Sequence, residues 1–300
     1  MPRFVPAAGL LLLLAAFAEQ APYRLSVDVN LVVLNATVQD RKGQSVGGLQ
    51  EGNFEVYEDG VRQSIRLFRH EDLPVTVGLV VDHSGSMRRK IPLVIAAARS
   101  LVAASNPGDQ VFVVNFNEHV TLGLPAATAF TSSVDELDAA ILRTRATGMT
   151  ALYDAVVEAE QRVQSGGHDK KVLIVISDGA DNASKNQLAD ALRQVERSSA
   201  VVYTIGIFDG DDPDGNPGVL LQLARVTGGE CFLPGKYDSL VANCQRIARD
   251  IRQQYTIGYA PSGAARPGVY RTIRVVARAP GSGKLVVRAR DGYIAGEAAQ

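Results

Sequence analysis

Between residues 73 and 251 the sequence alternates nearly continuous apolar runs with segments of helical periodicity, a pattern that restricts the fold strongly. Val75–Val81 and "KVLIVIS" (171–177) read as buried strands, whereas Ile91–Ala104 repeats apolar residues at helical spacing. Strands that are apolar on both faces need helices on both sides of the sheet. We therefore predict a doubly wound α/β domain with a mostly parallel sheet. The same reading predicts further strands at 109–116, 120–124, 201–207 and 230–233, and helices at 134–142, 151–163, 186–197, 218–227 and 239–251.

The segments on either side of this domain have β patterns instead. "LSVDVNLVVLNATVQD" (25–40) is rich in β-branched residues, and Asp59-Gly60 separates two short strand patterns in the manner of a tight hairpin. Three more strand patterns follow between 254 and 294. Three strands alone would bury little core. We therefore expect the two segments to pack as one discontinuous, β-sandwich-like domain. The predicted boundaries are 1–21, a signal peptide; 22–72, the first β segment; 73–252, the α/β domain; and 253–295, the second β segment.

The first 21 residues have the form of a secretory signal. Arg3 gives a positive start, Ala7–Ala18 is an apolar run, and Ala16-Phe17-Ala18 has the small-x-small form of a cleavage site. An uncleaved membrane anchor is the alternative, although the run is short for a bilayer. We expect a secreted or periplasmic protein with no membrane span after cleavage.

The net charge and the cysteine and histidine content argue against two classes of function, nucleic-acid binding and zinc binding. A net charge of −1 gives no electrostatic basis for nucleic-acid binding. In an oxidising compartment Cys231 and Cys244 could form a disulfide, and two buried, inert thiols are the alternative. The two cysteines and four histidines lack the spacing of a zinc cluster.

Oxygen-bearing side chains follow the ends of two predicted parallel strands. Asp82, Ser84 and Ser86 end "VGLVVDHSGSM", and Asp178 ends "KVLIVIS". The carboxyl ends of parallel strands meet at one edge of the sheet, where ligands bind. Thr150 begins a helix in the loop expected above that edge. Taken singly, the serines could be helix N-caps, Thr150 also a cap, and Asp178 a turn residue.

These motifs resemble the metal-ion-dependent adhesion site of von Willebrand factor type A domains. Asp82-His83-Ser84-Gly85-Ser86 matches the D-x-S-x-S signature, and "GMTALYDA" (148–155) and "VLIVISDGADN" (172–182) match the other two parts. The resemblance covers residues 73–252. With "VYEDGVRQSI" (56–65) and "QQYTIGY" (253–259) at its flanks, the layout resembles a secreted, acidobacterial-type bacterial form of the domain.

The resemblance implies that Asp82, Ser84, Ser86, Thr150 and Asp178 hold a divalent cation. Carboxylate and hydroxyl oxygens suit Mg²⁺, with Ca²⁺ or Mn²⁺ as alternatives. Two carboxylates leave the ion under-neutralised, and the resemblance implies that an Asp or Glu carboxylate of a protein partner fills the open position. The remaining motif position, His83, is expected at the rim, where it could touch the partner.

The leading hypothesis is therefore a secreted, non-catalytic adhesion module. A metal-dependent hydrolase is one alternative, but the sequence shows no nucleophile paired with a base and no G-x-S-x-G elbow. A structural domain stapled by the metal is the other.

The segment "FDGDDPDGNPG" (208–218) concentrates acidic residues after the strand at 201–207. It does not complete an EF-hand, because no closing glutamate follows. A solvated turn is the simple interpretation. The alternative is an acidic lip beside the cation site, or a second, weaker cation site, formed by Asp209, Asp211, Asp212 and Asp214.

Overall fold

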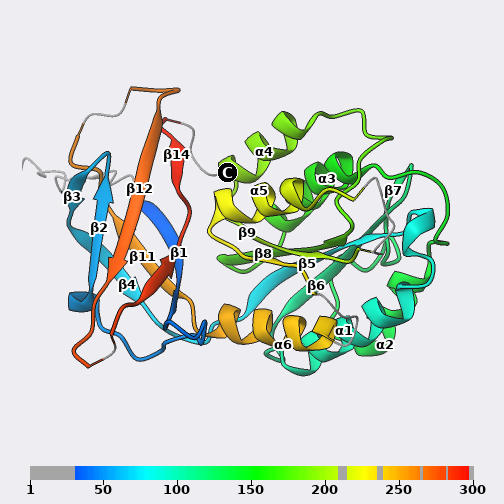
Figure 1. The fold of residues 1–300 in the computed structure, drawn as a ribbon, viewed down its shortest axis with the longest axis horizontal. Helices are drawn as coiled ribbons and strands as arrows, with labels where there is room; N and C mark the ends of the chain where they lie inside the picture. Colours follow the sequence, from blue (N-terminus) through cyan, green and yellow to red (C-terminus); the bar gives the residue numbers. More distant parts are fainter. Residues whose placement is uncertain (1–30, 209–214, 235–238, 264–265, 282, 297–300) are drawn as a thin grey trace, which may run out of the picture.

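The computed structural model describes residues 31–208, 215–234, 239–263, 266–281 and 283–296, whose strands form three sheets. Figure 1 shows two units beside each other: an α/β unit with helices on both faces of its sheet, and an all-β unit of two sheets. This arrangement confirms the predicted fold class. The predicted signal segment and the four aspartates at 209–214 lie outside the described residues.

The α/β unit is built on a six-stranded sheet in the order β10-β9-β8-β5-β6-β7. All neighbours run parallel except the edge strand β7, which is antiparallel to β6. The chain passes from β5 to β6 on one side and then continues at β8 on the other side, so the strand order reverses between β5 and β8. Such a reversal leaves a crevice at the carboxyl ends of the two strands. The strands are β5 (Val75–Asp82), β6 (Gln110–Phe116), β7 (Val120–Leu122), β8 (Lys170–Ser177), β9 (Val201–Gly206) and β10 (Cys231–Phe232).

Helices cover this sheet on both faces (Figure 1). Every residue of β5 is buried, as its unbroken apolar sequence predicts. The helices on one face are α1 (Ile91–Ala103), α2 (Val134–Leu142) and α6 (Ser239–Arg252); those on the other are α3 (Leu152–Gln164), α4 (Leu188–Arg197) and α5 (Pro217–Thr227). Two short 3₁₀ turns, η1 (Glu51–Asn53) and η2 (Gly85–Met87), complete the helical elements.

Each sheet of the β unit combines strands from both ends of the chain. One sheet has the order β13-β1-β11-β4 and the other β14-β12-β2-β3. Their facing sides form a second core that includes Leu34, Val56, Tyr255 and Ile257. The strands are β1 (Val32–Gln39), β2 (Phe54–Glu58), β3 (Val61–Gln63), β4 (Ile65–Arg69), β11 (Tyr255–Tyr259), β12 (Tyr270–Ala277), β13 (Val286–Arg288) and β14 (Gly292–Ile294).

The turn between β2 and β3 forms as the dipeptide Asp59-Gly60 predicts. Both residues have positive φ angles, +46° and +80°. This is the conformation of the tight hairpin turn whose twist matches that of the flanking strands.

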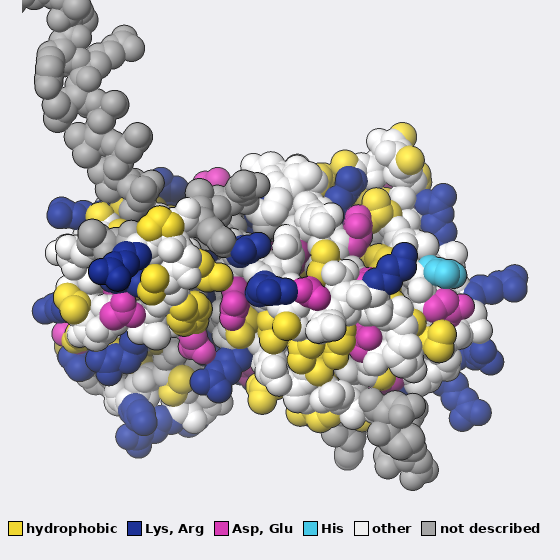
Figure 2. All heavy atoms as spheres, turned by 90° about the horizontal axis from the view of Figure 1, so that it is seen from above, with side chains coloured by type: hydrophobic (Ala, Val, Ile, Leu, Met, Phe, Trp, Pro, Cys, Tyr) yellow, Lys and Arg dark blue, Asp and Glu magenta, His cyan; other side chains and the backbone are white. Residues whose placement is uncertain are grey.

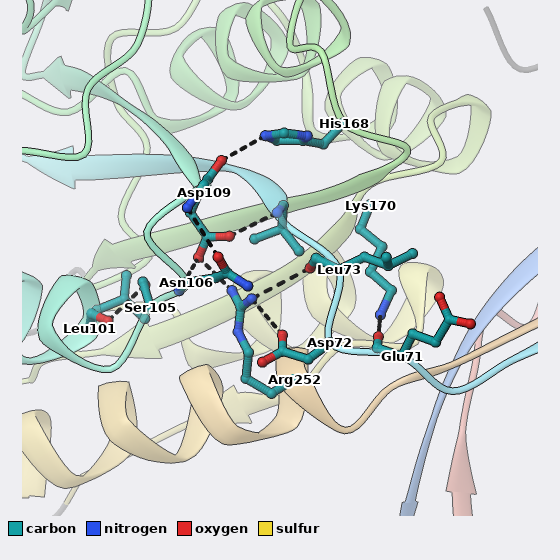
Figure 3. Close-up of polar contacts among 12 residues, drawn as sticks. Glu71, Asp72, Leu73, Leu101, Ser105, Asn106, Asp109, His168, Lys170 and Arg252 are labelled. Carbon is teal, nitrogen blue, oxygen red and sulfur yellow. Dashed lines mark hydrogen bonds and ion pairs between the residues drawn. The ribbon is translucent and has the colours of Figure 1, made fainter.

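Arg252 closes the junction where the chain enters and leaves the α/β unit (Figure 3). From the end of α6, its Nη1 donates to Asp72 Oδ1 at 2.8 Å and its Nη2 to Asp109 Oδ2 at 2.5 Å. Asp109 also accepts the amide of Val75 at 2.9 Å, at the first residue of β5. The last turn of α6 is thereby fixed to the start of the central strand.

A second group of charges joins α6 to the β unit. Asp250 on α6 has a fully buried side chain, and its Oδ2 lies 2.8 Å from Arg288 Nη2 on β13. Arg288 also lies 2.8 Å from Glu230 Oε2, and Glu230 accepts from Arg246 of α6 at 2.9 Å. These four side chains form the α6–β13 charge cluster, which holds the helix against the β unit.

The possible disulfide is not formed, and the alternative of two free thiols holds. Cys231 and Cys244 are both free thiols, the first half-buried in the short strand β10 and the second buried on α6. Cys244 is part of the apolar core of the α/β unit and packs there as a small hydrophobic side chain. None of the described helices is long and apolar enough to cross a membrane.

Candidate metal site

Asp82 is the last residue of β5, and its carboxylate is fixed on both sides by neighbouring donors. The side chain is fully buried. The amide of Ser84 donates to Oδ1 at 2.7 Å, and the hydroxyl of Ser177, at the end of β8, donates to Oδ2 at 2.6 Å. The carboxylate is therefore positioned at the point where the strand order of the sheet reverses.

Ser84 and Ser86 bring their hydroxyls to the same place from η2 and the residue before it. Their Oγ atoms lie 3.1 Å apart, and Ser86 Oγ donates to Asp178 Oδ2 at 2.6 Å. Asp178 follows β8, and its other oxygen accepts the amide of Ala180 at 3.2 Å. Asp178 therefore acts as a turn residue with one oxygen and reaches the serines with the other.

Thr150 belongs to a third loop, which backbone contacts join to the first. The amide of Gly85 donates to Gly148 O at 3.1 Å, and the amide of Thr147 donates to His83 O at 2.8 Å. Thr150 itself is buried, and its amide donates to Asn182 Oδ1 at 2.8 Å. All three predicted segments thus meet at the carboxyl edge of the sheet.

Gly148 is required for the path of this loop. Its φ angle is +81°, and a Cβ at this position would lie 1.6 Å from Glu118 Oε2. The same Glu118 oxygen accepts the amide of Met149 at 3.0 Å. The glycine lets the carboxylate come close enough to hold the residue before Thr150.

Burial sets the electrostatics of the site. Loss of hydration, together with the negative charge of Asp178, raises the pKa of Asp82 to about 6, although the hydrogen bonds from Ser177 and Ser84 act to lower it. A buried carboxylate beside a second carboxylate is costly in its charged form. A cation bound between them would offset that cost.

The local alternatives for the serines and Thr150 are wrong. The N-cap of α1 is Lys90 and that of α3 is Ala151, and neither helix has a side-chain cap bond. Ser84 precedes η2 but makes no capping bond either. Its hydroxyl faces Ser86, so the polar side chains of this segment are directed toward each other rather than toward a helix end.

His83 is not the rim residue that the sequence predicts. Its side chain is fully buried, and Nε2 lies 3.1 Å from Asn115 Oδ1 on β6. Burial lowers the pKa of His83. The His83 side chain lies against the neighbouring strand β6 and so supports the loop from below.

Several residues that support the site were not predicted from the sequence. Ser177 and Asn182 hold Asp82 and Thr150 in place, as described above. Asp181 accepts the amide of Tyr153 at 3.0 Å and thereby satisfies the first turn of α3. All three lie in "SDGADN" (177–182), whose density of small polar side chains was the available signal.

The chemistry of the five side chains suits a hard divalent cation. Two carboxylates and three hydroxyls offer oxygen only, which Mg²⁺, Ca²⁺ and Mn²⁺ accept and which Zn²⁺ uses less readily than nitrogen or sulfur. Within the described ranges, no group of three or more His, Cys, Asp or Glu could hold a metal ion. An ion held at this edge by the described residues would therefore need oxygen ligands besides carboxylates, and the three hydroxyls can supply them.

Comparisons with known proteins identify the fold. The von Willebrand factor type A domain in Catenulispora acidiphila superposes with a TM-score of 0.53 at 14% identity, covering 89% of this chain and 75% of that one. Proximal thread matrix protein 1 from the mussel byssus, solved with a zinc-occupied MIDAS motif, gives 0.52 at 18% identity, covering 65% and 49%. No curated protein sequence matches. The model of the von Willebrand factor type A domain matches residues 76–240, more than half of the sequence. The chain belongs to the von Willebrand factor type A domain family.

Proposed function

We propose that this protein is a secreted, metal-dependent adhesion module. Asp82, Ser84, Ser86, Thr150 and Asp178 would hold Mg²⁺, with Ca²⁺ or Mn²⁺ as alternatives. When bound, the ion would offer a coordination position to an Asp or Glu carboxylate of a protein partner.

One observation carries the proposal. Ser86 Oγ lies 2.6 Å from Asp178 Oδ2 and 3.1 Å from Ser84 Oγ, although Asp178 is 92 positions from Ser86 in the chain. The fold brings these oxygens together at an edge where Ser86 is exposed and Asp82 is buried. A buried carboxylate can hold an ion from below, while an exposed hydroxyl beside it leaves the outer side open to a partner.

The solved structures with a similar fold support a binding role. The mussel byssus protein is described with a metal in the motif that these residues resemble. Membership of the family, together with the donor set above, favours a metal-dependent binding site over other uses of this edge.

A hydrolytic role has weaker support, because three of the four histidines lie away from the open side of the candidate metal site. The fourth, His119, is exposed in the turn between β6 and β7, and none of the described hydrogen bonds orients its ring. His83 is buried against Asn115. His70 stacks on Tyr255 with ring centroids 4.2 Å apart, and His168 contacts Gly108 O, both at the amino end of the sheet. A metal-bound water at the carboxyl edge would lack these bases. We therefore propose a non-catalytic protein.

The proposal is tested by capture of extracellular proteins on the immobilised chain, with Mg²⁺ and then with chelator. The matched pair of variants is Asp82→Asn, which removes a buried donor charge, and Asp135→Asn, which removes an exposed charge on α2. We expect Mg²⁺-dependent capture that Asp82→Asn abolishes and Asp135→Asn preserves. Capture unaffected by chelator would contradict the proposal.

A structural staple predicts a different response. If the ion only tied the three loops together, chelation would lower the melting temperature strongly and partner binding would fall only through unfolding. For an adhesion site we expect Asp82→Ala to lose partner binding with little change in melting, because a neutral side chain relieves the burial of the carboxylate.

A further inference from the structure

A large cleft lies between the two units, at the end of the α/β unit opposite to the candidate metal site. Its volume is about 1180 Å³. The outer face of one β-unit sheet contributes Asn35, Thr256 and Arg69, which are neighbours across β1, β11 and β4. Residues 164–171 and 196–199 of the α/β unit line the opposite wall. Lys and Arg side chains lie near this junction, beside apolar side chains of the β unit (Figure 2).

The cleft reaches a strand edge that lacks a partner over part of its length. On β1, β13 pairs with Thr37–Gln39 only. On the same side, no described strand pairs with Val32–Ala36, which pair with β11 on the other side. Four residues from 31 to 35 line the cleft. Unpaired backbone groups of this kind are a template for an added strand.

Apolar side chains accompany this edge. Leu31 and Val33 are 41% and 47% exposed, unusual values for large hydrophobic side chains next to a cleft. Tyr293 and Ile294, from the edge strand β14 of the other sheet, also line the cleft. An occupant with apolar side chains on one face would bury all four.

The remaining lining is predominantly basic. Five cationic side chains line the cleft, against two acidic ones: Arg69, Lys170, Lys171, Arg197 and Arg290 against Asp169 and Glu196. Lys171 and Arg290 donate to backbone carbonyls. These neutral acceptors satisfy the donors without neutralising the positive charges. Burial lowers the pKa of Lys170 and of Arg290, because it disfavours their charged forms. An anion bound beside them would stabilise those charged forms.

We propose that this cleft binds an extended, acidic segment of a partner protein. The segment pairs with the free edge of Val32–Ala36, continuing the line of β13, and places apolar side chains on Leu31 and Val33. Carboxylates at other positions on that same face of the segment point toward the basic wall, because alternate residues of a strand point to opposite faces. This site is separate from the proposed metal site and requires no metal.

A peptide fits these features better than a polyanionic polysaccharide or the chain's own leading residues. A polysaccharide would use the cations but neither the strand edge nor the apolar side chains. Residues 22–30 continue directly into β1 and carry one arginine and one aspartate, so they offer little charge complementarity to the wall. Both alternatives give distinct results in the following experiment.

The test is fluorescence anisotropy with a labelled peptide that carries valine and glutamate on one strand face and threonine at the intervening positions, measured on the full chain in the presence of chelator. A valine–lysine peptide controls for charge, and the same acidic peptide methylated on alternate backbone nitrogens controls for strand pairing. We expect binding of the unmodified acidic peptide alone, weakening as salt rises. Equal binding of the methylated peptide, or of heparin, would overturn the proposal in favour of a simple polyanion site.

Two charge reversals complete the test. Arg197→Glu changes an exposed residue of the basic wall of the cleft, and Lys42→Glu changes an exposed residue outside the cleft. We expect Arg197→Glu to weaken peptide binding about tenfold or more, and Lys42→Glu to change it less than about twofold. Equal effects of the two reversals would refute the proposal. So would much tighter binding after deletion of residues 22–30, because it would assign the cleft to the chain itself.

Discussion

Removing one partner from the α6–β13 charge cluster should destabilise the protein far more than removing a surface ion pair. Arg288 lies 2.8 Å from Asp250, whose side chain is fully buried, whereas Arg278 lies 3.0 Å from Glu55 with 73% of its own side chain exposed. Arg288→Met leaves a buried carboxylate without its cation, which costs about 3–5 kcal/mol. Arg278→Met removes a hydrated pair worth about 0–1 kcal/mol.

The assay is thermal and urea unfolding of both variants, followed by circular dichroism. For a domain of this size, the cost predicted for Arg288→Met corresponds to a fall in melting temperature of about 10 °C, with a much smaller change for Arg278→Met. The double variant Arg288→Met/Asp250→Leu should recover much of the loss, because no buried charge is left unpaired. Equal, small effects of the two single variants would refute the claim that the cluster holds α6 to the β unit.

Three further predictions concern other parts of the chain. The Glu160 carboxyl group is fully buried, and burial raises its pKa to about 7. Stability should therefore fall as pH rises from about 4.5 to about 7, by at most about 3 kcal/mol. Glu160→Gln should remove this dependence and be the more stable form at about pH 8, and an unchanged pH profile would contradict the assignment. Gly148→Ala should reduce Mg²⁺ affinity measured by calorimetry, because its Cβ would displace Glu118, whereas Gly60→Ala, with a similar φ of +80° and open space around it, should not. Burial raises the pKa of Cys244 to about 12, so iodoacetamide should leave it unmodified in the native protein, and thiol titration after denaturation should find two free thiols per chain rather than none.

The fold of the α/β unit follows largely from periodicity. The helix predicted at 134–142 is α2 with the same bounds, and the strand predicted at Val75–Val81 extends by only one residue, to Asp82. These elements have strong local signals, because strands buried on both faces carry few polar residues. The tight turn at Asp59-Gly60 is likewise local, since few dipeptides adopt its two positive φ angles.

Features that depend on tertiary contacts were not predictable in this way. His83 has the sequence context of an exposed motif residue, and only the neighbouring Asn115 on β6 explains its burial. The serines had the local appearance of caps, yet Ser86 is directed toward an aspartate 92 positions away. The α6–β13 charge cluster consists of charged residue types that usually lie in solvent, and only the packing of the two units buries Asp250.

The proposed ion is tested most directly by its position. Crystals grown with Mn²⁺ in place of Mg²⁺ would give an anomalous scattering signal from the ion itself. We predict a peak within coordination distance of Asp82, Ser84, Ser86, Thr150 and Asp178, absent from crystals of Asp82→Asn. Wild-type crystals with full Mn²⁺ exposure and no peak among these five side chains would contradict the assignment of a metal site.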